Sequence, residues 1–540
     1  MKTTYRDILK WGNKEEQTLD PDVKRLIKEA FGADESIFSQ KYLSGETEIK
    51  IPESKLSPEI IKAAEEIAGK ENVLTDDESR AKFSHGKFYG ELLELRKEQI
   101  ASPPDAVICP KSQEDVRKII DFCNEKQIPI VPSGGRSSVT RGVESPKGGI
   151  ALDLTKHLNQ IIEINETDQT VRVQAGIFGP EFEDALNAKG YTCGHFPQSF
   201  EYSTVGGWIA AKGAGQASTG YGKIEDLTVA LKAETPAGSI HTTDYPKNAQ
   251  GWDTFPLFIG SEGTLGVITE ATLKIFKHRP KNTAYAAFAF KNFENAVEAM
   301  RQMIQNENGK PHLFRISDPQ ETDVVFKTKG FEGTASDRVL QFLGYKPGSR
   351  CLMFVSIEGD KAFAKLVKRK FKKIAKKFRG FYLGEKPVKK WLEQRFSGSY
   401  MRDPLMDVGL MTDTLETSVT WSNLLKLWKA TRKYAEARPK TIFMIHISHV
   451  YENGANLYFT FISPMEKGNE REDFENFYQG LVNTIVQNGG SLSHHHGVGR
   501  TLGPRMEEQI GKTAMNAMRA VKKYFDPNNI MNPGGMLGLD

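Results

Sequence analysis

The spacing of apolar residues changes character near residue 100. Before it, charged segments with helical spacing, such as 21–27 and 57–62, predict a mainly helical extension over residues 1–100. After it, short apolar runs alternate with amphipathic stretches, which predicts an α+β fold. Ser112 is placed to cap a helix that runs to about Lys126. Strands are expected at 106–109, 128–132, 150–153 and 170–173.

The alternation resumes after about residue 280 and predicts a second α+β domain. Its expected strands lie at 285–290, 352–355 and 456–461. The end of the chain predicts one more helix, at about 505–524, and a turn-rich tail. A chain of 540 residues is too long for one ordinary core, so several domains are expected. The predicted parts are 1–100, 101–280, 281–490 and 491–540.

Composition narrows the class of protein. A hydrophobic fraction of 39% and an aromatic fraction of 10% are typical of a globular chain and exclude a disordered one. No apolar run reaches the roughly 20 residues that span a bilayer, and the amino terminus lacks the apolar core of a secretory signal. The carboxyl terminus is not a peroxisomal address, so we expect a cytoplasmic protein. A net charge of +4 gives no reason to expect nucleic acid binding.

Two further patterns concern cysteines and local charge. Four scattered cysteines without a C-x-x-C pair predict buried thiols, not a zinc site or disulfides. Residues 361–379 form a basic run whose apolar residues recur at helical spacing, which predicts an amphipathic helix with a cationic outer face. Two interpretations stay open: a solvated face over a buried stripe, or a peripheral contact with an anionic membrane or an acidic partner.

Small residues gather in three turns of the first α+β domain. The turn Pro132–Thr140 follows an expected strand, and its two glycines allow a ligand to approach the backbone closely. Its N–H groups and hydroxyls suit a pyrophosphate, although it matches neither the G-x-G-x-x-G fingerprint nor a P-loop. The segments 204–215 and 260–269 repeat this concentration of glycine and small residues. The three turns together predict a cofactor site.

The order of these turns resembles the FAD-binding domain of the vanillyl-alcohol-oxidase superfamily. The resemblance implies a PCMH-type FAD-binding domain of two subdomains, an α+β cap domain for the substrate, and a C-terminal segment that returns to the flavin. The residues it implies for FAD binding are Pro132, Ser133, Gly134, Gly135, Arg136, Ser137, Ser138, Val139, Thr140, Ser203, Thr204, Gly206, Gly207, Ile209, Ala210, Glu262, Gly263, Gly266 and Ile268.

Two residues bear on how the flavin is held. Arg136 stands where relatives often have glycine, so it is expected either to add charge to the pyrophosphate site or to point outward. Covalent attachment in this superfamily uses a suitably placed His or Cys. The Gly-Gly turn has neither, and His195 is not in that context. We therefore expect non-covalent FAD.

Two branches of the superfamily compete for the chemistry. Metal-dependent 2-hydroxyacid dehydrogenases carry two histidines on a cap strand and a later Glu-His-Gly. Here Tyr458 replaces the second histidine and His495 replaces the glutamate, although His449 remains. A phenol and a neutral imidazole make a poor site for a hard ion, so no metal is expected. The tail 525–535 resembles the dehydrogenases more, so oxidation of a small 2-hydroxy acid such as lactate or glycolate stays the alternative.

The second branch is alkyldihydroxyacetone-phosphate synthase, which the segments 447–449, 489–499 and 400–403 resemble better. That resemblance implies exchange of an acyl chain for a fatty alcohol in ether-lipid synthesis, through an adduct on flavin N5, and a homodimer. Tyr458 would be the general acid/base that moves the substrate's α-proton, with a pKa shifted by its neighbours toward a useful value. His494, His495 and His496 would position the substrate. Arg402 and Arg315 would bind phosphate or couple charge to the site.

A third, minor interpretation is a non-catalytic flavin-binding protein, which would keep the FAD turns without needing Tyr458, His496 or the two arginines. The expected substrate is a small molecule or a lipid phosphate.

Overall fold

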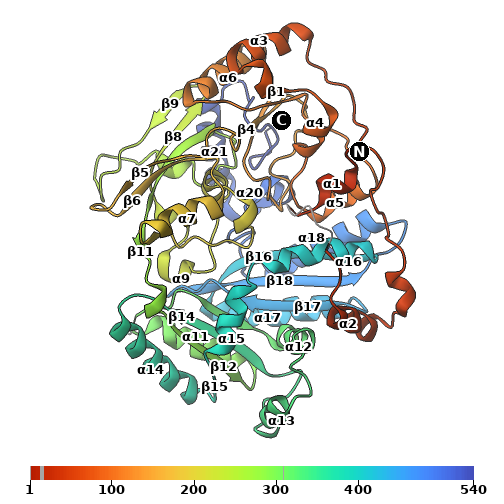
Figure 1. Ribbon diagram of the computed structural model, residues 1–540, viewed down its shortest axis with the longest axis vertical. Coiled ribbons are helices and arrows are strands. Elements are labelled where there is room, and N and C mark those ends of the chain that lie inside the picture. Colours follow the sequence, from red (N-terminus) through yellow and green to blue (C-terminus); the bar gives the residue numbers. More distant parts are fainter. Residues whose placement is uncertain (1, 12–16, 308, 540) are drawn as a thin grey trace.

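The computed structural model describes residues 2–11, 17–307 and 309–539. Figure 1 shows two bodies, with the sheets of residues 73–274 above and one large sheet of residues 284–464 below. The four buried cysteines form no disulfide, as predicted. No helix among the described residues is long and apolar enough to cross a membrane.

The upper body contains two sheets. In the first, β2, β4 and β3 are parallel and β1 is an antiparallel edge. Its strands are β1 (Val73–Leu74), β2 (Ala106–Ile108), β4 (Ile150–Asp153) and β3 (Ile130–Ser133). The second sheet is antiparallel, with the order β5 (Ile161–Asn165), β6 (Thr170–Gln174), β10 (Val267–Lys274), β8 (Thr228–Thr235) and β9 (Gly238–His241). Two short strands, β7 (Tyr191–Thr192) and β11 (Phe276–Lys277), pair separately.

Helices cover these sheets. The predicted cap of α6 (Gln113–Lys126) is present, because the Ser112 side chain accepts the backbone N–H of Asp115 at 3.1 Å. The other helices of this body include α3 (Pro58–Ala68), α4 (Asp77–Lys82), α5 (Tyr89–Arg96), α7 (Gly179–Ala188), α8 (Val205–Ala210), α9 (Ser218–Tyr221) and α10 (Ile224–Leu227).

The lower body is built on a seven-stranded antiparallel sheet. Its order is β15 (Phe381–Gly384), β12 (Ala284–Phe290), β14 (Cys351–Ile357), β13 (Phe314–Ser317), β17 (Ile442–Ile447), β18 (Gly454–Pro464) and β16 (Leu410–Thr420). Apolar residues of one face pack on α11 (Phe293–Gln305), α14 (Lys361–Lys377), α17 (Trp421–Glu436) and α18 (Glu470–Gln487). On the other face, α13 (Ala335–Phe342) and α15 (Lys386–Glu393) cover the β12–β14 end, and α12 (Pro319–Thr328) extends from there to β13 and β17.

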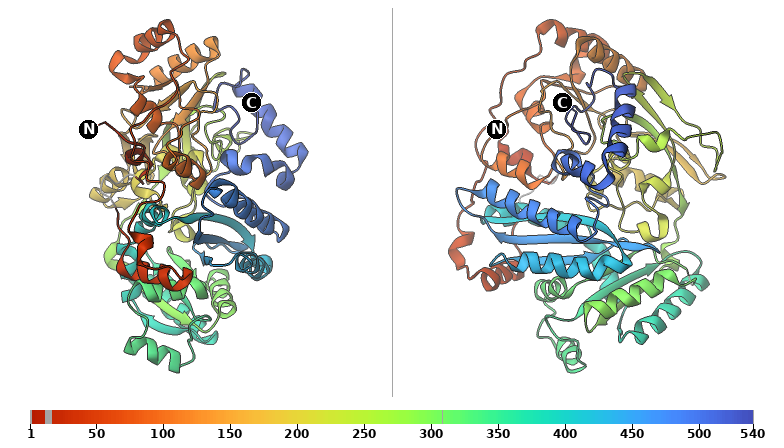
Figure 2. Two further views of the ribbon diagram at one scale, coloured as in Figure 1. Left: turned by 90° about the vertical axis from the view of Figure 1, so that its right-hand side faces the viewer. Right: turned by 180° about the vertical axis from the view of Figure 1, so that it is seen from behind.

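Both chain ends tie the two bodies together. The N-terminal segment places α1 (Tyr5–Leu9) beside α5, whereas α2 (Pro21–Phe31) packs on the lower sheet and on α16 (Arg402–Asp407) (Figure 1). The tail returns to the upper body, where Met531 bridges Ile130 of β3 (Figure 2). The predicted helix at 505–524 is wrong as one element. It divides into α20 (Met506–Ile510) and α21 (Lys512–Phe525) because Gly511 adopts a φ of 82°.

The register of the lower sheet places polar residues in one row. Glu416 of β16 lies opposite Tyr458 of β18, Tyr458 lies opposite His446 of β17, and His446 lies opposite Ser317 of β13. Side chains alternate between the two faces of a strand, and the neighbours of this row are core residues such as Leu457 and Phe459. The row therefore occupies the face that the core helices leave free. The candidate site is built on it.

Candidate active site

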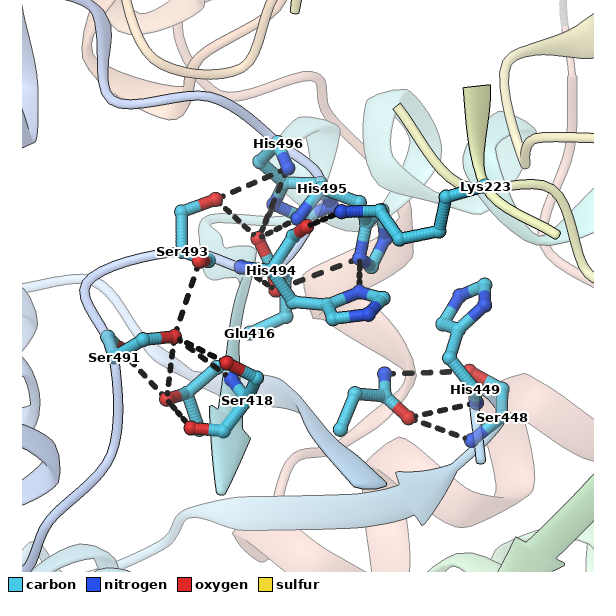
Figure 3. A network of polar contacts seen from close by, with 12 residues as sticks. Lys223, Glu416, Ser418, Ser448, His449, Ser491, Ser493, His494, His495 and His496 are labelled. Atoms are coloured by element: carbon cyan, nitrogen blue, oxygen red, sulfur yellow. Dashed lines mark hydrogen bonds and ion pairs between the residues drawn. The ribbon is translucent and has the colours of Figure 1, made fainter. Parts of the chain in front are cut away.

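Glu416 holds the histidine segment in place (Figure 3). Its Oε1 accepts the Ser493 hydroxyl at 2.7 Å and the backbone N–H groups of His495 and His496 at 3.1 and 3.0 Å. Its Oε2 accepts the His494 N–H at 2.7 Å. Burial acts to raise the pKa of Glu416, but the neighbouring imidazoles outweigh it and hold that pKa well below its usual range. A buried anion therefore orders the turn.

The three imidazoles point in different directions. His495 and His496 lie against Tyr458, with ring centroids 5.9 and 5.5 Å from the phenol ring. His494 turns the other way, where its Nε2 bonds the Tyr451 hydroxyl at 2.8 Å and its Nδ1 lies 3.0 Å from Nδ1 of His495. Two of the three rings therefore share a site with Tyr458.

A second buried network approaches Tyr458 from the opposite side. The His446 ring stacks on the phenol with centroids 4.7 Å apart and planes 14° apart. His446 Nδ1 bonds Glu321 at 3.1 Å, and Glu321 in turn pairs with Arg315. The Arg315 guanidinium is committed to this carboxylate and to the Trp391 ring, 5.6 Å away. The pair with Glu321 favours charge coupling for Arg315 over phosphate binding, and both roles stay predictions.

The protonation states differ from the expectation for Tyr458. Burial raises the pKa of Tyr458 to about 12, so the phenol is not shifted toward neutrality and stays protonated. Burial also lowers the pKa of His446 and of His496 to about 4, which leaves both imidazoles neutral. The expectation of a usefully lowered phenol pKa is wrong for the protein without ligand. The site instead offers a phenol as proton donor beside neutral imidazoles.

Arg402 has unused hydrogen-bonding capacity. It starts α16, donates from Nη1 to the Lys87 carbonyl and lies over the Trp11 ring at 5.4 Å. Its Nε and Nη2 atoms are buried without a protein partner in the part of the chain that the structure describes. Burial raises the pKa of Asp413, three residues before Glu416 on β16, and the charge of Arg402 acts against that rise. Two free guanidinium N–H groups suit an anion such as phosphate.

The predicted FAD turn has the geometry of an anion cradle. No backbone N–H of residues 134–137 donates to a protein acceptor among the described residues. A Cβ on Gly135 would lie 2.0 Å from the Tyr202 carbonyl, and one on Gly134 would lie 2.3 Å from Thr204 Oγ1. These glycines let the turn lie directly against the 202–204 segment. Free N–H groups beside close-approach glycines fit a pyrophosphate.

The other predicted FAD segments meet at the same place. The carbonyls of Ile209 and Ala210 accept the N–H groups of Gly260 and Glu262, both at 2.9 Å. The Thr204 side chain caps α8 by accepting the Gly207 N–H. The predicted residues thus form three adjoining segments: 132–140 (Pro132, Ser133, Gly134, Gly135, Arg136, Ser137, Ser138, Val139, Thr140), 203–210 (Ser203, Thr204, Gly206, Gly207, Ile209, Ala210) and 262–268 (Glu262, Gly263, Gly266, Ile268).

Two residues of this group have roles that the sequence did not reveal. Arg136 does not point outward: its guanidinium lies 4.3 Å from the Phe83 ring and donates to the Lys82 carbonyl at 2.5 Å. Glu262 accepts the N–H groups of Val498 and Gly499 at 2.7 and 2.8 Å. Glu262 therefore ties the end of the histidine segment to the FAD-binding turns.

Three histidines meet the geometric requirement for a metal site. The ligating nitrogens of His449, His494 and His495 all lie within 4.8 Å of one another. His449 Nδ1 bonds the Ser218 hydroxyl at 2.7 Å, so its Nε2 is the nitrogen that could bind a metal ion. The trio contains no carboxylate, so its donors suit a borderline ion better than a hard one.

Sequence reasoning missed several residues of the site. Glu321 and His446 belong to no motif. The sequence does show that His446 and Tyr458 each stand between two apolar residues of a strand, and this alternation could have predicted that both side chains face away from the core. His195 was considered only for flavin attachment. It is 1% exposed, lies 4.7 Å from the Trp208 ring, and neither ring nitrogen has a partner among the residues described. An unpartnered buried imidazole in the FAD-binding region fits a site that a cofactor completes.

Comparison with known proteins supports the same interpretation. The FAD binding domain model matches residues 104–244, and the model for the C-terminal domain of FAD linked oxidases matches residues 279–536. Alkyldihydroxyacetonephosphate synthase of Dictyostelium discoideum is 32% identical over 90% of this chain and 82% of its own length. The chain belongs to the FAD-linked oxidase family that contains these synthases.

Two further matches are a solved structure and a relative with another named activity. A solved alkyldihydroxyacetonephosphate synthase structure superposes with a TM-score of 0.82 at 27% identity, covering 98% of this chain and 100% of that one. A glycolate oxidase subunit of Bacillus subtilis is 28% identical over 82% of this chain and 91% of its own length. The protein is thus an FAD-dependent enzyme with the predicted PCMH-type fold. The cradle of residues 134–137 and the unpartnered His195 fit this cofactor.

Proposed function

We propose that this enzyme exchanges the acyl chain of acyl-dihydroxyacetone phosphate for a fatty alcohol and releases a fatty acid, without net oxidation. The observation that carries the proposal is the position of Tyr458 between His446 on one side and His495 and His496 on the other. The synthases named above, which align with most of the length of this chain, support it.

The residues would divide the work as follows. The neutral His496 imidazole takes a proton from the substrate carbon beside the carbonyl, and the Tyr458 phenol donates its proton to the fatty acid carboxylate as the C–O bond to the acyl group breaks. The fatty alcohol then forms the new C–O bond and gives its hydroxyl proton to the Tyr458 phenolate, and the protonated His496 returns its proton to the substrate carbon, so both residues end as they began. The free Nε and Nη2 of Arg402 bind the phosphate. Glu416 keeps the histidine backbone rigid while these groups act. When bound, FAD would supply an electron-accepting ring for the exchange.

The test is release of fatty acid from acyl-dihydroxyacetone phosphate in the presence and absence of a fatty alcohol, with the alkyl product identified by mass. Tyr458→Phe and His496→Ala are expected to lose turnover about 100-fold or more while they retain FAD. Tyr434→Phe removes a hydroxyl that bonds the Phe477 carbonyl outside the site, so it should keep wild-type turnover. Unchanged turnover in Tyr458→Phe would refute the assignment.

Oxidation of a small 2-hydroxy acid is the second candidate. The grouping of His449, His494 and His495 favours it, because such enzymes can use a metal to orient the substrate. The discriminating result is reduction of the flavin by D-lactate or glycolate that is lost after treatment with a chelator and restored by a divalent ion. We continue to expect neither metal dependence nor covalent attachment of FAD. Acid precipitation should leave the flavin in the supernatant.

A further inference from the structure

The helix α14 carries a surface that the proposed reaction does not use. Every charged residue between Lys361 and Lys377 is basic. The helix begins at Asp360, whose side chain accepts the Ala362 N–H at 2.8 Å. Figure 1 shows α14 at the lower left of the lower body, away from the upper body that contains the FAD-binding turns. The positive charge is therefore concentrated on one peripheral helix.

The inward face of α14 is already occupied. Ala364, Val367, Phe371 and Ala375 are buried in the core that α14 shares with α11 and β12. Their spacing of three and four residues is that of one helical stripe. The basic residues lie outside this stripe, so they are not needed to pack the helix onto the cap domain.

The basic residues have few anionic partners. In the described parts of the chain, the one ion pair of α14 joins Lys368 to Glu385. Lys372 lies 3.9 Å from the centre of the Tyr382 ring, which does not neutralise its charge. Six cations lie together on one open, shallow surface of this helix: Lys365, Lys368, Arg369, Lys372, Lys373 and Lys376. Like charges at neighbouring positions of a helix repel one another. Anions that cover this surface relieve the repulsion and so lower its free energy.

Two apolar side chains stand among these charges. Phe363 is 41% exposed and Leu366 is 40% exposed. Leu366 is three residues before Arg369 and four before Lys370, so all three share one side of the helix. Exposed apolar residues between lysines are typical of helices that lie in the headgroup region of a bilayer. The lysines meet the lipid phosphates there and the apolar side chains enter the acyl boundary.

We propose that α14 docks the enzyme on the surface of an anionic lipid bilayer. The partner rests on the proposed function, because acyl-dihydroxyacetone phosphate and fatty alcohols partition into membranes. Charge complementarity and the apolar pair favour a lipid surface over an acidic protein. The docking is peripheral and needs no membrane-spanning segment.

The test measures flotation of the FAD-bound enzyme with vesicles of phosphatidylglycerol and phosphatidylcholine, compared with phosphatidylcholine alone. Wild type should float only with the anionic vesicles and should be released by about 0.5 M salt, because the Debye length then falls to about 4 Å. The triple variant Lys365→Glu/Lys373→Glu/Lys376→Glu should bind at least about tenfold more weakly, because each basic residue near such a surface strengthens binding about fivefold.

A matched control separates this surface from overall charge. Lys426→Glu/Lys433→Glu/Lys512→Glu changes three exposed lysines elsewhere and gives the same net charge. It should float like wild type. Leu366→Ala should weaken flotation and keep its salt dependence. Wild type that ignores anionic vesicles, or an α14 variant that floats like the control, would overturn the proposal.

The vesicles contain no substrate, so the result does not depend on the reaction. Turnover of a short-chain, water-soluble substrate should be unchanged in the α14 variant, and turnover of a substrate embedded in anionic vesicles should fall at least about fivefold. If no substrate is turned over but flotation follows the prediction, the proposed function fails and the docking stands.

Discussion

Glu416 Oε1 accepts the backbone N–H of His496 at 3.0 Å, across 80 residues of sequence. Because the same carboxylate also accepts the N–H groups of His494 and His495, one buried charge sets the position of all three imidazoles. Its substitution tests whether the order of this turn matters to the reaction.

Glu416→Gln should lower both stability and turnover. The amide keeps an acceptor oxygen but loses the charge and places a donor against backbone N–H groups. We expect a loss of about 3 kcal/mol in the free energy of unfolding, measured by denaturant titration. Turnover should fall with FAD still bound, because Glu416 does not line the FAD-binding turns. Glu234→Gln, a buried carboxylate on β8, is the control and should keep turnover. Full activity in Glu416→Gln would contradict the assigned role.

Arg402→Lys should weaken phosphate recognition. Lysine cannot reproduce the Nε and Nη2 donors, so kcat/KM for a phosphate-bearing substrate should fall about 10- to 100-fold. The same reaction with a substrate analogue that lacks phosphate should be unaffected. Arg350→Lys changes a buried arginine paired with Asp337 far from the site, and it should alter stability without this selectivity. Equal losses on both substrates would mean that Arg402 acts in another way.

The pKa of His496 predicts how stability depends on pH. Burial lowers this pKa from 6.5 to about 4. Between these values the unfolded imidazole binds a proton and the folded one does not. The contribution of His496 is therefore complete above pH 6.5 and is lost as the pH falls toward 4, by roughly 3 kcal/mol. His496→Asn should flatten the stability profile in this window. Parallel profiles for wild type and His496→Asn would disprove the shift.

Gly135→Ala tests the FAD-binding turn. The added methyl would lie 2.0 Å from the Tyr202 carbonyl, so the turn must move away from the 202–204 segment. We expect protein purified without bound flavin, measured by visible absorbance against total protein. Gly398→Ala meets no atom closer than 3.8 Å and should retain a full complement of FAD.

The sequence predicted the parts of this fold whose causes are local. Ser112 caps α6 as expected. A Cβ on Gly263 would lie 3.1 Å from Pro132, so two of the glycine-rich turns lie side by side, and their binding of FAD stays a prediction. The helix break at Gly511 was missed, because a glycine within a periodic pattern does not reveal a φ of 82°.

Properties that depend on distant residues were not predictable in this way. The pKa of Tyr458 rises because the folded chain buries it, and no neighbour in sequence signals that burial. The bonds from Glu416 to the histidine turn, and from Glu321 to His446, join segments that only the sheet register brings together. The sequence predicted the candidate reacting residues but not the carboxylates that contact them.

The visible spectrum of the bound flavin under anaerobic conditions tests the central claim most directly. With acyl-dihydroxyacetone phosphate and a fatty alcohol, fatty acid and alkyl product should accumulate over many turnovers while the flavin is oxidised at the end of the reaction. With D-lactate, glycolate or 2-hydroxyglutarate the flavin should stay oxidised. Rapid bleaching by a hydroxy acid, without chain exchange, would contradict the account.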